Sequence, residues 1–210
     1  MKKSNDWDRI VRDSEIRESE GIREKQKNPW WYELLDWAKY ILAAVLIGFL
    51  LTNYVIQRNE VVGESMYPTL QDNDQLWVEK ISPVIDKIDH GDIITFSIHD
   101  PALGPAADED LVKRVIGIPG DHLEIKDDGV YLNDARLDES YLVDGMITYK
   151  SSEATYNDII LEEGMYFVMG DNRINSRDSR SFGPIHEDDI IGEVWIRIYP
   201  FSRFGFLNSD

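Results

Sequence analysis

Ser65 is the residue whose setting most favours chemistry. It lies in the stretch VVGESMYPTL, residues Val61–Leu70, where Gly63 gives the backbone freedom and Pro68 prevents continuation of a central strand. The sequence therefore predicts a sharp turn that presents one hydroxyl group. A free serine is a weak nucleophile, so catalysis at Ser65 would require a second residue that takes its proton.

Histidine and cysteine offer no good partner for Ser65. The chain has no cysteine, which excludes a disulfide framework, a thiolate metal site and a cysteine nucleophile. Its four histidines read as surface residues rather than bases: His90, His99, His122 and His186. No H-x-x-H or H-E-x-x-H spacing appears, so we expect neither a metal ion nor another cofactor.

Lys113, in LVKRVIGIPGD, is the better candidate. On a strand, Leu111, Lys113 and Val115 share one face, so the ammonium group lies between two apolar neighbours. Burial disfavours the charged form and lowers the pKa of a lysine. To be largely neutral near pH 8, the pKa must fall from about 10.4 by about 2.4, which costs roughly 3.3 kcal/mol and is within the reach of burial. The spacing alone also fits an exposed lysine on an edge strand.

One long apolar run, WAKYILAAVLIGFLLTNYVI, occupies Trp37–Ile56, and its single charged residue, Lys39, lies near the start. Twenty residues of α-helix span about 30 Å, the thickness of the hydrocarbon core of a bilayer. No A-x-A-like site follows the run, which therefore does not fit a cleaved signal peptide. We predict a retained transmembrane anchor over residues 34–56; the alternative is a helix buried in a protein core.

The charges that flank this run predict its orientation. Residues 1–33 contain eight Lys and Arg residues, whereas Arg58 is the only basic residue between the run and Lys80. By the positive-inside rule, residues 1–33 form a cytoplasmic tail and residues 57–210 lie outside the cell membrane. The net charge of -18, from 22 basic and 40 acidic residues, falls on the outer part and argues against a nucleic-acid partner.

The outer part, residues 57–210, reads as a mainly β domain. Short runs rich in β-branched and aromatic residues are bounded by Gly, Pro, Asp or Asn, which is typical of strands. The runs are DQLWVEKI, GDIITFSI, LVKRVIGI, DHLEIKDDGVYLN, GMYFVMG and GEVWIRIYP. Asp128-Gly129 predicts a hairpin between HLEIK and VYLN. Residues 99–110 and most of residues 171–184 are expected to be loops.

Three motifs, SMYPTL, KRVIGIPGD and GDNRINSRDSRSFG, occur in this order behind one predicted anchor. Together they resemble type I signal peptidases (peptidase family S26) in the form found in Gram-positive bacteria, over about Trp37–Pro200. The resemblance implies an all-β catalytic domain with a smaller inserted β subdomain, here at about residues 121–161. It also implies that Ser65 is the nucleophile and Lys113 its general base.

The third motif implies a supporting set of residues. By resemblance, Ser176 donates a hydroxyl group that orients the amine of Lys113, and an ion pair between Asp178 and Arg180 holds the loop. Residues 170–172 shape the start of the same loop. These roles agree with the need of a buried neutral amine for aligned partners.

Gly63 affects which groups could donate hydrogen bonds to the oxyanion that forms when a serine attacks a peptide bond. It stands two residues before Ser65, where some members of the family carry a serine hydroxyl group. The backbone N–H of Ser65 should provide one donor, and the second is either an N–H near Gly63 or a water molecule. Loss of such a donor typically costs about 3–4 kcal/mol, so we expect a second donor to exist.

Signal peptidases cut secretory preproteins after small residues, usually in an Ala-x-Ala pattern. The resemblance therefore implies secretory preproteins and the lipid bilayer as partners, with an extended substrate lying beside the strands near Ser65 and Lys113. Shallow apolar pockets would exclude large side chains. Candidate lining residues, each of which could equally be ordinary core, are Val61, Val62, Met66, Leu111 and Val115.

The same residues allow three alternative functions, of which two can be excluded. A self-cleaving repressor with a serine–lysine pair would be cytoplasmic and would carry a DNA-binding module, which the predicted anchor and the acidic exterior contradict. A serine-x-x-lysine acyl enzyme is excluded because position 68 is proline. The remaining alternative is a catalytically silent, membrane-tethered β domain that binds partners, and the presence of both Ser65 and Lys113 favours the enzyme.

Overall fold

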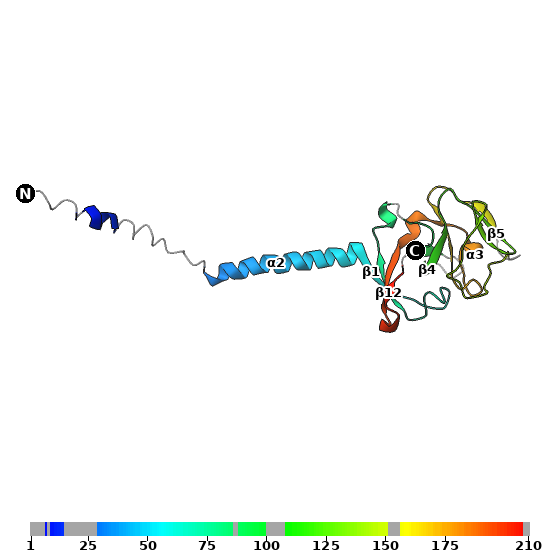
Figure 1. The fold of residues 1–210 in the computed structure, drawn as a ribbon, viewed down its shortest axis with the longest axis horizontal. Helices are drawn as coiled ribbons and strands as arrows, with labels where there is room; N and C mark the ends of the chain where they lie inside the picture. Colours follow the sequence, from blue (N-terminus) through cyan, green and yellow to red (C-terminus); the bar gives the residue numbers. More distant parts are fainter. Residues whose placement is uncertain are drawn as a thin grey trace, which may run out of the picture. The chain divides into compact units, whose positions relative to one another are not determined.

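The computed structural model of the chain describes residues 7, 9–14, 29–85, 88–99, 108–150 and 156–207. The chain divides into two units, Met1–Phe49 and Leu50–Asp210. In the first unit, residues 9–14 are helical and Trp30–Leu50 form helix α2 (Figure 1). Most of the predicted cytoplasmic tail, residues 1–33, lies outside the described residues.

Helix α2 is an apolar helix whose side chains are largely exposed. From Tyr40 onward it contains no charged residue, and none of its residues is buried. The chain then passes into a π-helical turn, η1 (Leu51–Val55), and into strand β1 (Ile56–Glu60). Over the described ranges, no helix combines the length and the apolar character required to cross a membrane. The anchor over residues 34–56 therefore stays a prediction.

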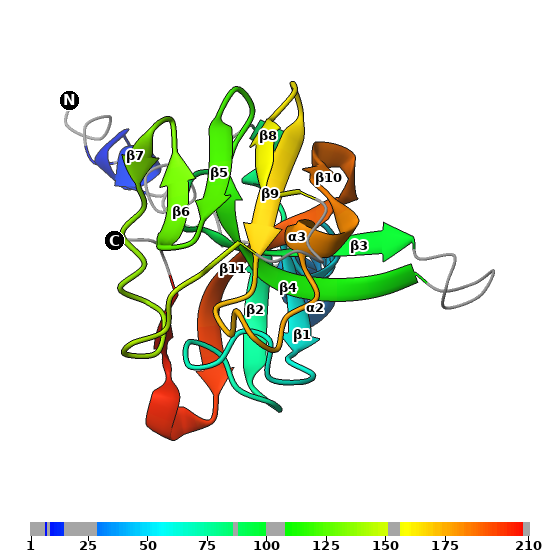
Figure 2. The same cartoon turned by 90° about the vertical axis from the view of Figure 1, so that its right-hand side faces the viewer.

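The second unit is mainly β, as predicted. Its larger sheet is antiparallel and has the strand order β1-β2-β11-β3-β4-β9-β10, with β12 paired to β11 (Figure 2). The strands beyond β1 are β2 (Gln75–Glu79), β3 (Ile93–His99), β4 (Asp108–Gly117), β9 (Met165–Met169), β10 (Ile185–His186), β11 (Ile190–Tyr199) and β12 (Gly205–Phe206). The helical segments are short: η2 (Pro83–Ile85), α3 (Ser179–Phe182), η4 (Glu187–Asp189) and η5 (Phe201–Arg203).

A second sheet, with the order β7-β6-β5-β8, lies in sequence between β4 and β9. Its strands are β5 (His122–Lys126), β6 (Gly129–Leu132), β7 (Ala135–Arg136) and β8 (Asp158–Ile160). All four fall inside residues 121–161, the range expected for the inserted subdomain. The predicted hairpin joins β5 to β6, where Lys126 pairs with Gly129 across the turn formed by Asp127 and Asp128.

Each of the six predicted strand runs contains a strand, because β-branched and aromatic residues between turn residues fit the pleated surface of a sheet. Alternation cannot reveal β7, β8, β10 and β12, which have two or three residues each. Strand β1 was also not predicted. Its first residue, Ile56, extends the apolar run of the predicted anchor, so the helix boundary was set too far along the chain.

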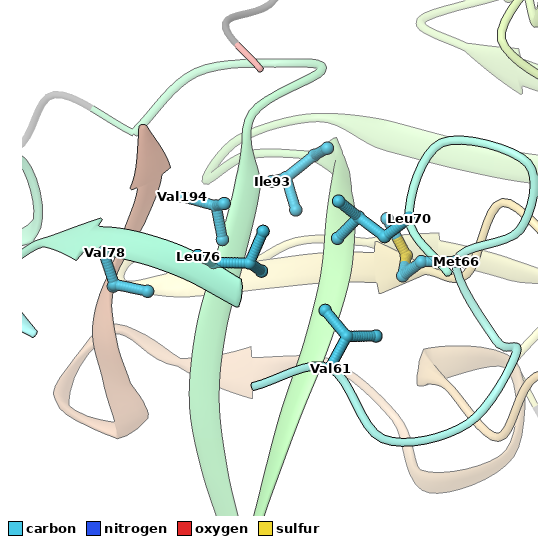
Figure 3. Packing of buried hydrophobic residues seen from close by; sticks show 7 residues of the cluster. All are labelled: Val61, Met66, Leu70, Leu76, Val78, Ile93 and Val194. Carbon is cyan, nitrogen blue, oxygen red and sulfur yellow. The ribbon is translucent and has the colours of Figure 1, made fainter. Parts of the chain in front are cut away.

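One hydrophobic cluster fixes the stretch that carries Ser65. Met66 and Leu70 are fully buried, and such a burial stabilises a fold by about 1.5–3 kcal/mol for each side chain. The stretch is therefore packed on the large sheet and not a free loop. Figure 3 shows the members of the cluster: Val61, Met66, Leu70, Leu76, Val78, Ile93 and Val194.

Two further clusters position β4 and the inserted sheet. The second cluster includes Phe96 of β3, Val115 of β4 and Val168 of β9. The third contains Leu123 and Val130 from the inserted sheet together with residues of the large sheet, among them Phe167. Because the third cluster is shared, the inserted sheet is packed against the large sheet.

Candidate active site

Strand β4 carries Lys113 into the interior of the fold. Lys113 pairs across the sheet with Ile94, which is itself fully buried. Leu111 and Val115, two residues to either side, pack in the second cluster. As a result, Lys113 is only 2% exposed. The exposed edge lysine that the spacing also allowed is not what the structure contains.

The Ser65 turn is held from both ends. The N–H of Val61 donates to the carbonyl of Asp74 at 2.9 Å, and the N–H of Asn73 returns a bond of 2.9 Å to the carbonyl of Val61. Gly63 has a φ of 90°, a value that side chains with a Cβ rarely adopt, and its N–H donates to Oδ1 of Asp72 at 2.8 Å. Half-buried Ser65 is thus presented by a turn with a fixed backbone.

The two side chains meet. Nζ of Lys113 lies 2.9 Å from Oγ of Ser65 and 2.9 Å from the carbonyl oxygen of Val112. In the neutral amine, the lone pair can accept the hydroxyl proton at this distance, which is within reach for general-base chemistry. None of the described histidine side chains, which are those of His90, His122 and His186, contacts Ser65; their ring partners are carboxylates and a backbone N–H.

Burial lowers the pKa of Lys113 to about 8. The carboxylates of Asp178, Glu109 and Asp171 act in the opposite direction and raise it, but their combined effect is smaller than that of desolvation. At pH 8, the amine of Lys113 is therefore uncharged in about half of the molecules. An unperturbed lysine would be almost fully protonated at that pH.

A second loop, residues 170–178, holds the backbone of Ser65. The backbone N–H of Asn172 donates to the carbonyl of Ser65 at 3.0 Å, and its side-chain amide donates to the carbonyl of Glu64 at 3.1 Å. Gly170 lies so close that a Cβ there would overlap the carbonyl oxygen of Ser65 and Oγ of Ser176. Only glycine allows this approach without displacing the backbone.

The residues predicted to support the lysine all lie on or beside this loop. Asp178 and Arg180 form a two-pronged ion pair, with Nε to Oδ1 and Nη2 to Oδ2 both at 2.8 Å. Asp178 also accepts the N–H of Gly170 at 3.0 Å and caps helix α3. Oγ of Ser176 is buried and makes no hydrogen bond to any described residue.

On the opposite face of β4, Arg114 ties the strand to the same loop. Its guanidinium donates to both carboxylate oxygens of Asp171, at 2.9 and 2.8 Å, and to the carbonyl of Gly91 at 2.7 Å. Thr69, which follows the Ser65 turn, donates to Oδ2 of Asp171 at 2.5 Å. Sequence reasoning did not single out Thr69, because no spacing links it to residues about a hundred positions away.

The residues predicted to line a substrate pocket separate into two groups. Val62 is 87% exposed and Leu111 is half-buried. Met66 and Val115 have exposed fractions of 1% and 0% and belong to the first and second clusters, as does Val61 to the first. Their side chains offer no surface to a substrate, because the turn directs Val61 and Met66 into the first cluster and strand β4 directs Val115 into the second.

One edge beside the lysine is open. Strand β4 pairs with β3 along residues 108–114 but with β9 only from Arg114 to Gly117. Within the described part of the chain, the other edge of β4 from Asp108 to Lys113 therefore has no partner strand. Such an edge can accept an added peptide strand.

One cluster of metal-ligating groups occurs among the described residues. Ligand atoms of His122, Glu124 and Asp158 lie within 4.8 Å of one another in the inserted sheet. Glu124 is already paired with Lys126 at 3.0 Å, and His122 with Asp158 at 2.9 Å. These groups are not in contact with Ser65 or Lys113, and the absence of a metal cofactor stays a prediction.

Comparisons with known proteins agree on one family. The family model described as "Signal peptidase, peptidase S26" matches residues 34–199. Signal peptidase IB of Staphylococcus aureus (strain MRSA252) is 36% identical over 186 residues, which cover 83% of this chain and 94% of that protein. Probable signal peptidase I-2 of a Synechocystis species is 31% identical over 195 residues, covering 93% of this chain and 85% of that protein.

A crystal structure of a signal peptidase I from Enterococcus faecalis V583 is also similar, with 33% sequence identity and a TM-score of 0.40, over 51% of this chain and 97% of that chain. The family model and the relatives each extend over most of the chain, and the family model includes the regions of Ser65, Lys113 and the 170–178 loop. The chain therefore belongs to the type I signal peptidases of peptidase family S26 and is a hydrolase.

Proposed function

We propose that this protein is a membrane-bound serine endopeptidase that removes N-terminal signal peptides from secreted preproteins. Ser65 is the nucleophile and Lys113 the general base. The observation that carries this proposal is the 2.9 Å contact between Oγ of Ser65 and the amine of a lysine that is 2% exposed. Burial leaves a large fraction of the amine uncharged at mildly alkaline pH, and only the uncharged amine can accept the proton of the serine hydroxyl group.

The reaction follows from this pair. Neutral Lys113 takes the proton of Ser65 as Oγ attacks the carbonyl carbon of the scissile peptide bond. The resulting ammonium gives this proton to the departing amine, the C–N bond breaks, and the signal peptide remains as an ester on Ser65. Lys113 then deprotonates the water that attacks the ester, and it returns the proton to Oγ as the acid leaves.

The oxyanion of each tetrahedral intermediate needs hydrogen-bond donors. The backbone N–H of Ser65 makes no hydrogen bond to the described residues and serves as one donor. The N–H of Gly63 is already bound to Asp72, so the second donor is another N–H of the turn or a water molecule. Ser176, whose buried hydroxyl group is unsatisfied, orients the amine once the substrate closes the site. The Asp178–Arg180 pair keeps the loop in place.

The substrate binds as an extended strand along the open edge of β4. Backbone hydrogen bonds to residues 108–113 would align the peptide, while Val62 and Leu111 contact its side chains. The Ala-x-Ala pattern that the resemblance implies would require shallow pockets for small side chains beside Ser65. One missing or extra methylene group in such a pocket changes selectivity by about 10- to 200-fold.

The apolar segment would bring the site to its substrates. Residues from Tyr40 to Ile56 carry no charge, and the large apolar side chains of α2 are exposed. An apolar surface of this kind is unfavourable in water and marks a contact with a membrane or another protein. A bilayer would bury this surface and would also hold the apolar part of a signal peptide. We therefore propose a single-pass protein with its tail in the cytoplasm and its β domain outside.

The test is cleavage of a purified preprotein with an Ala-x-Ala site by the full chain in detergent micelles. We expect Ser65→Ala and Lys113→Ala each to lower the rate by at least about 1,000-fold. Ser202→Ala and Lys150→Ala, which change exposed residues outside the site, serve as matched controls with normal rates. Cleavage by either site variant would contradict the assignment of Ser65 and Lys113 as nucleophile and general base. A wild-type protein that binds but never cuts would favour the silent binding domain.

A further inference from the structure

Arg173 lies in the middle of the loop that grips Ser65, yet its side chain points to the inserted subdomain. The residue is 5% exposed. Its guanidinium donates to Oε1 of Glu139 and to Oγ1 of Thr148, and its Nη2 donates to the hydroxyl group of Tyr141 at 3.0 Å. Glu139, Tyr141 and Thr148 all belong to the segment between β7 and β8, more than twenty residues away in sequence.

The fourth bond of Arg173 returns to its own loop. Nε donates to the carbonyl of Gly170 at 3.0 Å. Gly170 is the residue whose Cα lies against the carbonyl of Ser65, and the N–H of Asn172 binds that same carbonyl at 3.0 Å. The arginine therefore fixes the short turn from Gly170 to Asn172, which in turn fixes the backbone of Ser65.

The inserted segment contacts the lysine side of the site as well. The ring of Tyr141 has the guanidinium of Arg114 4.2 Å from its centroid and that of Arg173 5.8 Å from it. Arg114 follows Lys113 directly in β4 and binds Asp171 of the loop. Tyr141 of the insert thus lies beside the residue that follows Lys113 and beside the arginine that holds the turn in contact with Ser65.

A buried charge is stable only when it is paired and its donors are satisfied. Within the described residues, Glu139 is the only carboxylate that pairs with Arg173, and its side chain is 12% exposed. Thr148 also donates to this carboxylate, at 3.3 Å. The network is therefore a rigid set of aligned bonds in a region of low dielectric constant, where loss of one member leaves others unsatisfied.

We propose that the segment Glu139–Thr148 of the insert acts as a brace for the catalytic loop, with Arg173 as a positioning residue that sets Ser65 against Lys113. The inference rests on the proposed function, since it assigns a task within that same site. It gives the inserted subdomain a role in catalysis although none of its residues touches Ser65 or Lys113.

The experiment compares Glu139→Gln and Arg173→Lys with wild type in the full chain. Glu139→Gln keeps the shape but removes the charge, and Arg173→Lys keeps the charge but removes the fork that reaches Gly170 and Thr148. Because a displacement of 1 Å at a reacting atom can cost about 100-fold, we expect kcat to fall about 10- to 100-fold. KM should change less than about threefold, since Val62, Leu111 and the edge of β4 are untouched.

A second readout separates positioning from simple stability. A loosened loop would admit water to Lys113, and this raises the pKa of the lysine towards 10.5, so the alkaline rise in rate should move to higher pH. The charged groups that face the amine, Asp178, Glu109 and Asp171, are unchanged in both variants. The pKa can also be measured without a substrate, from the pH dependence of chemical labelling of Lys113 followed by mass spectrometry.

Matched controls come from the insert itself. Glu124→Gln and Arg136→Lys alter a half-buried ion pair and an exposed hydrogen bond in the inserted sheet, and both should keep normal kcat and the normal pH profile. The double variant Glu139→Met with Arg173→Met refills the space with apolar groups. It should recover the melting temperature but not kcat, because the bond to Gly170 stays absent.

The brace is refuted if Glu139→Gln and Arg173→Lys keep kcat and the labelling pKa of Lys113 while the melting temperature falls. It is also refuted if the double methionine variant restores both stability and kcat, which would give the network a purely structural role. If wild type itself does not cleave preproteins, the proposed function fails, and the labelling experiment still decides whether the insert controls the environment of Lys113.

Discussion

Replacing Lys113 with methionine should abolish cleavage and, at neutral pH, make the fold more stable. The structure holds this lysine at a pKa of about 8 against 10.5 in an unfolded chain. The folded state thus gives up the proton more readily, so the penalty is full below pH 8 and disappears as the pH rises past 10.5. From these two values the penalty is about 3.3 kcal/mol at pH 7 and about 0.8 kcal/mol at pH 10.

Methionine removes this penalty but also the two hydrogen bonds of the amine, to Ser65 and to the carbonyl of Val112, which contribute about 1 kcal/mol each. The variant should therefore be about 1 kcal/mol more stable than wild type at pH 7 and about 1 kcal/mol less stable at pH 10. The change of sign is the diagnostic feature, because a simple gain in packing would not depend on pH.

Urea unfolding of the full chain in detergent micelles, at pH 7 and at pH 10, measures both differences. Lys150→Met is the control, since Lys150 is exposed and its replacement should have little effect at either pH. If the stability difference between Lys113→Met and wild type changes by less than about 1 kcal/mol between the two pH values, the amine is not buried in the way described here.

Two further variants test the loop. Gly170→Ala places a methyl group where the carbonyl of Ser65 and Oγ of Ser176 lie, so we expect cleavage to fall at least about 100-fold, whereas Gly205→Ala, with open space around it, should cleave normally; equal rates would contradict the close approach. Asp178→Asn leaves Arg180 without its carboxylate and should cost about 3–5 kcal/mol in urea unfolding. A loss of less than about 1 kcal/mol would contradict the buried ion pair.

The sequence places Lys113 between two apolar neighbours on one face of a long strand, but this spacing alone also fits an exposed lysine on an edge strand. In the structure, the apolar residues at 111 and 115 pack in the second cluster, and position 113 lies on the same inner face. Its contact with Ser65, 48 positions away, is a property of the fold that no local spacing records. The expectation that the two residues act together came from the three family motifs, not from the pattern of the strand.

The pocket prediction shows where local reasoning fails. Met66 follows Ser65 directly, so the sequence predicts it near the substrate, but the N–H of Leu70 donates to the carbonyl of Met66 at 2.9 Å and the turn closes over the core. Both side chains then pack beneath it. The direction of a side chain in a tight turn depends on such backbone bonds, which the sequence does not reveal.

Arg173 is the clearest residue that sequence reasoning missed. In NRINSRDSR it looks like one of several exposed arginines of a polar loop. Its carboxylate partner, Glu139, is 34 positions away in a segment without regular secondary structure. Only the packing of the inserted sheet against the large sheet brings the two residues together, and this packing depends on the third hydrophobic cluster.

The pH dependence of kcat/KM for preprotein cleavage tests the central claim most directly, because it reports the base in the free enzyme. With a pKa of about 8 for Lys113, the rate should rise about tenfold from pH 7 to pH 9 and then level off. A rate that is constant from pH 6 to pH 10, or that continues to rise beyond pH 10 as for a solvent-exposed lysine, would contradict it.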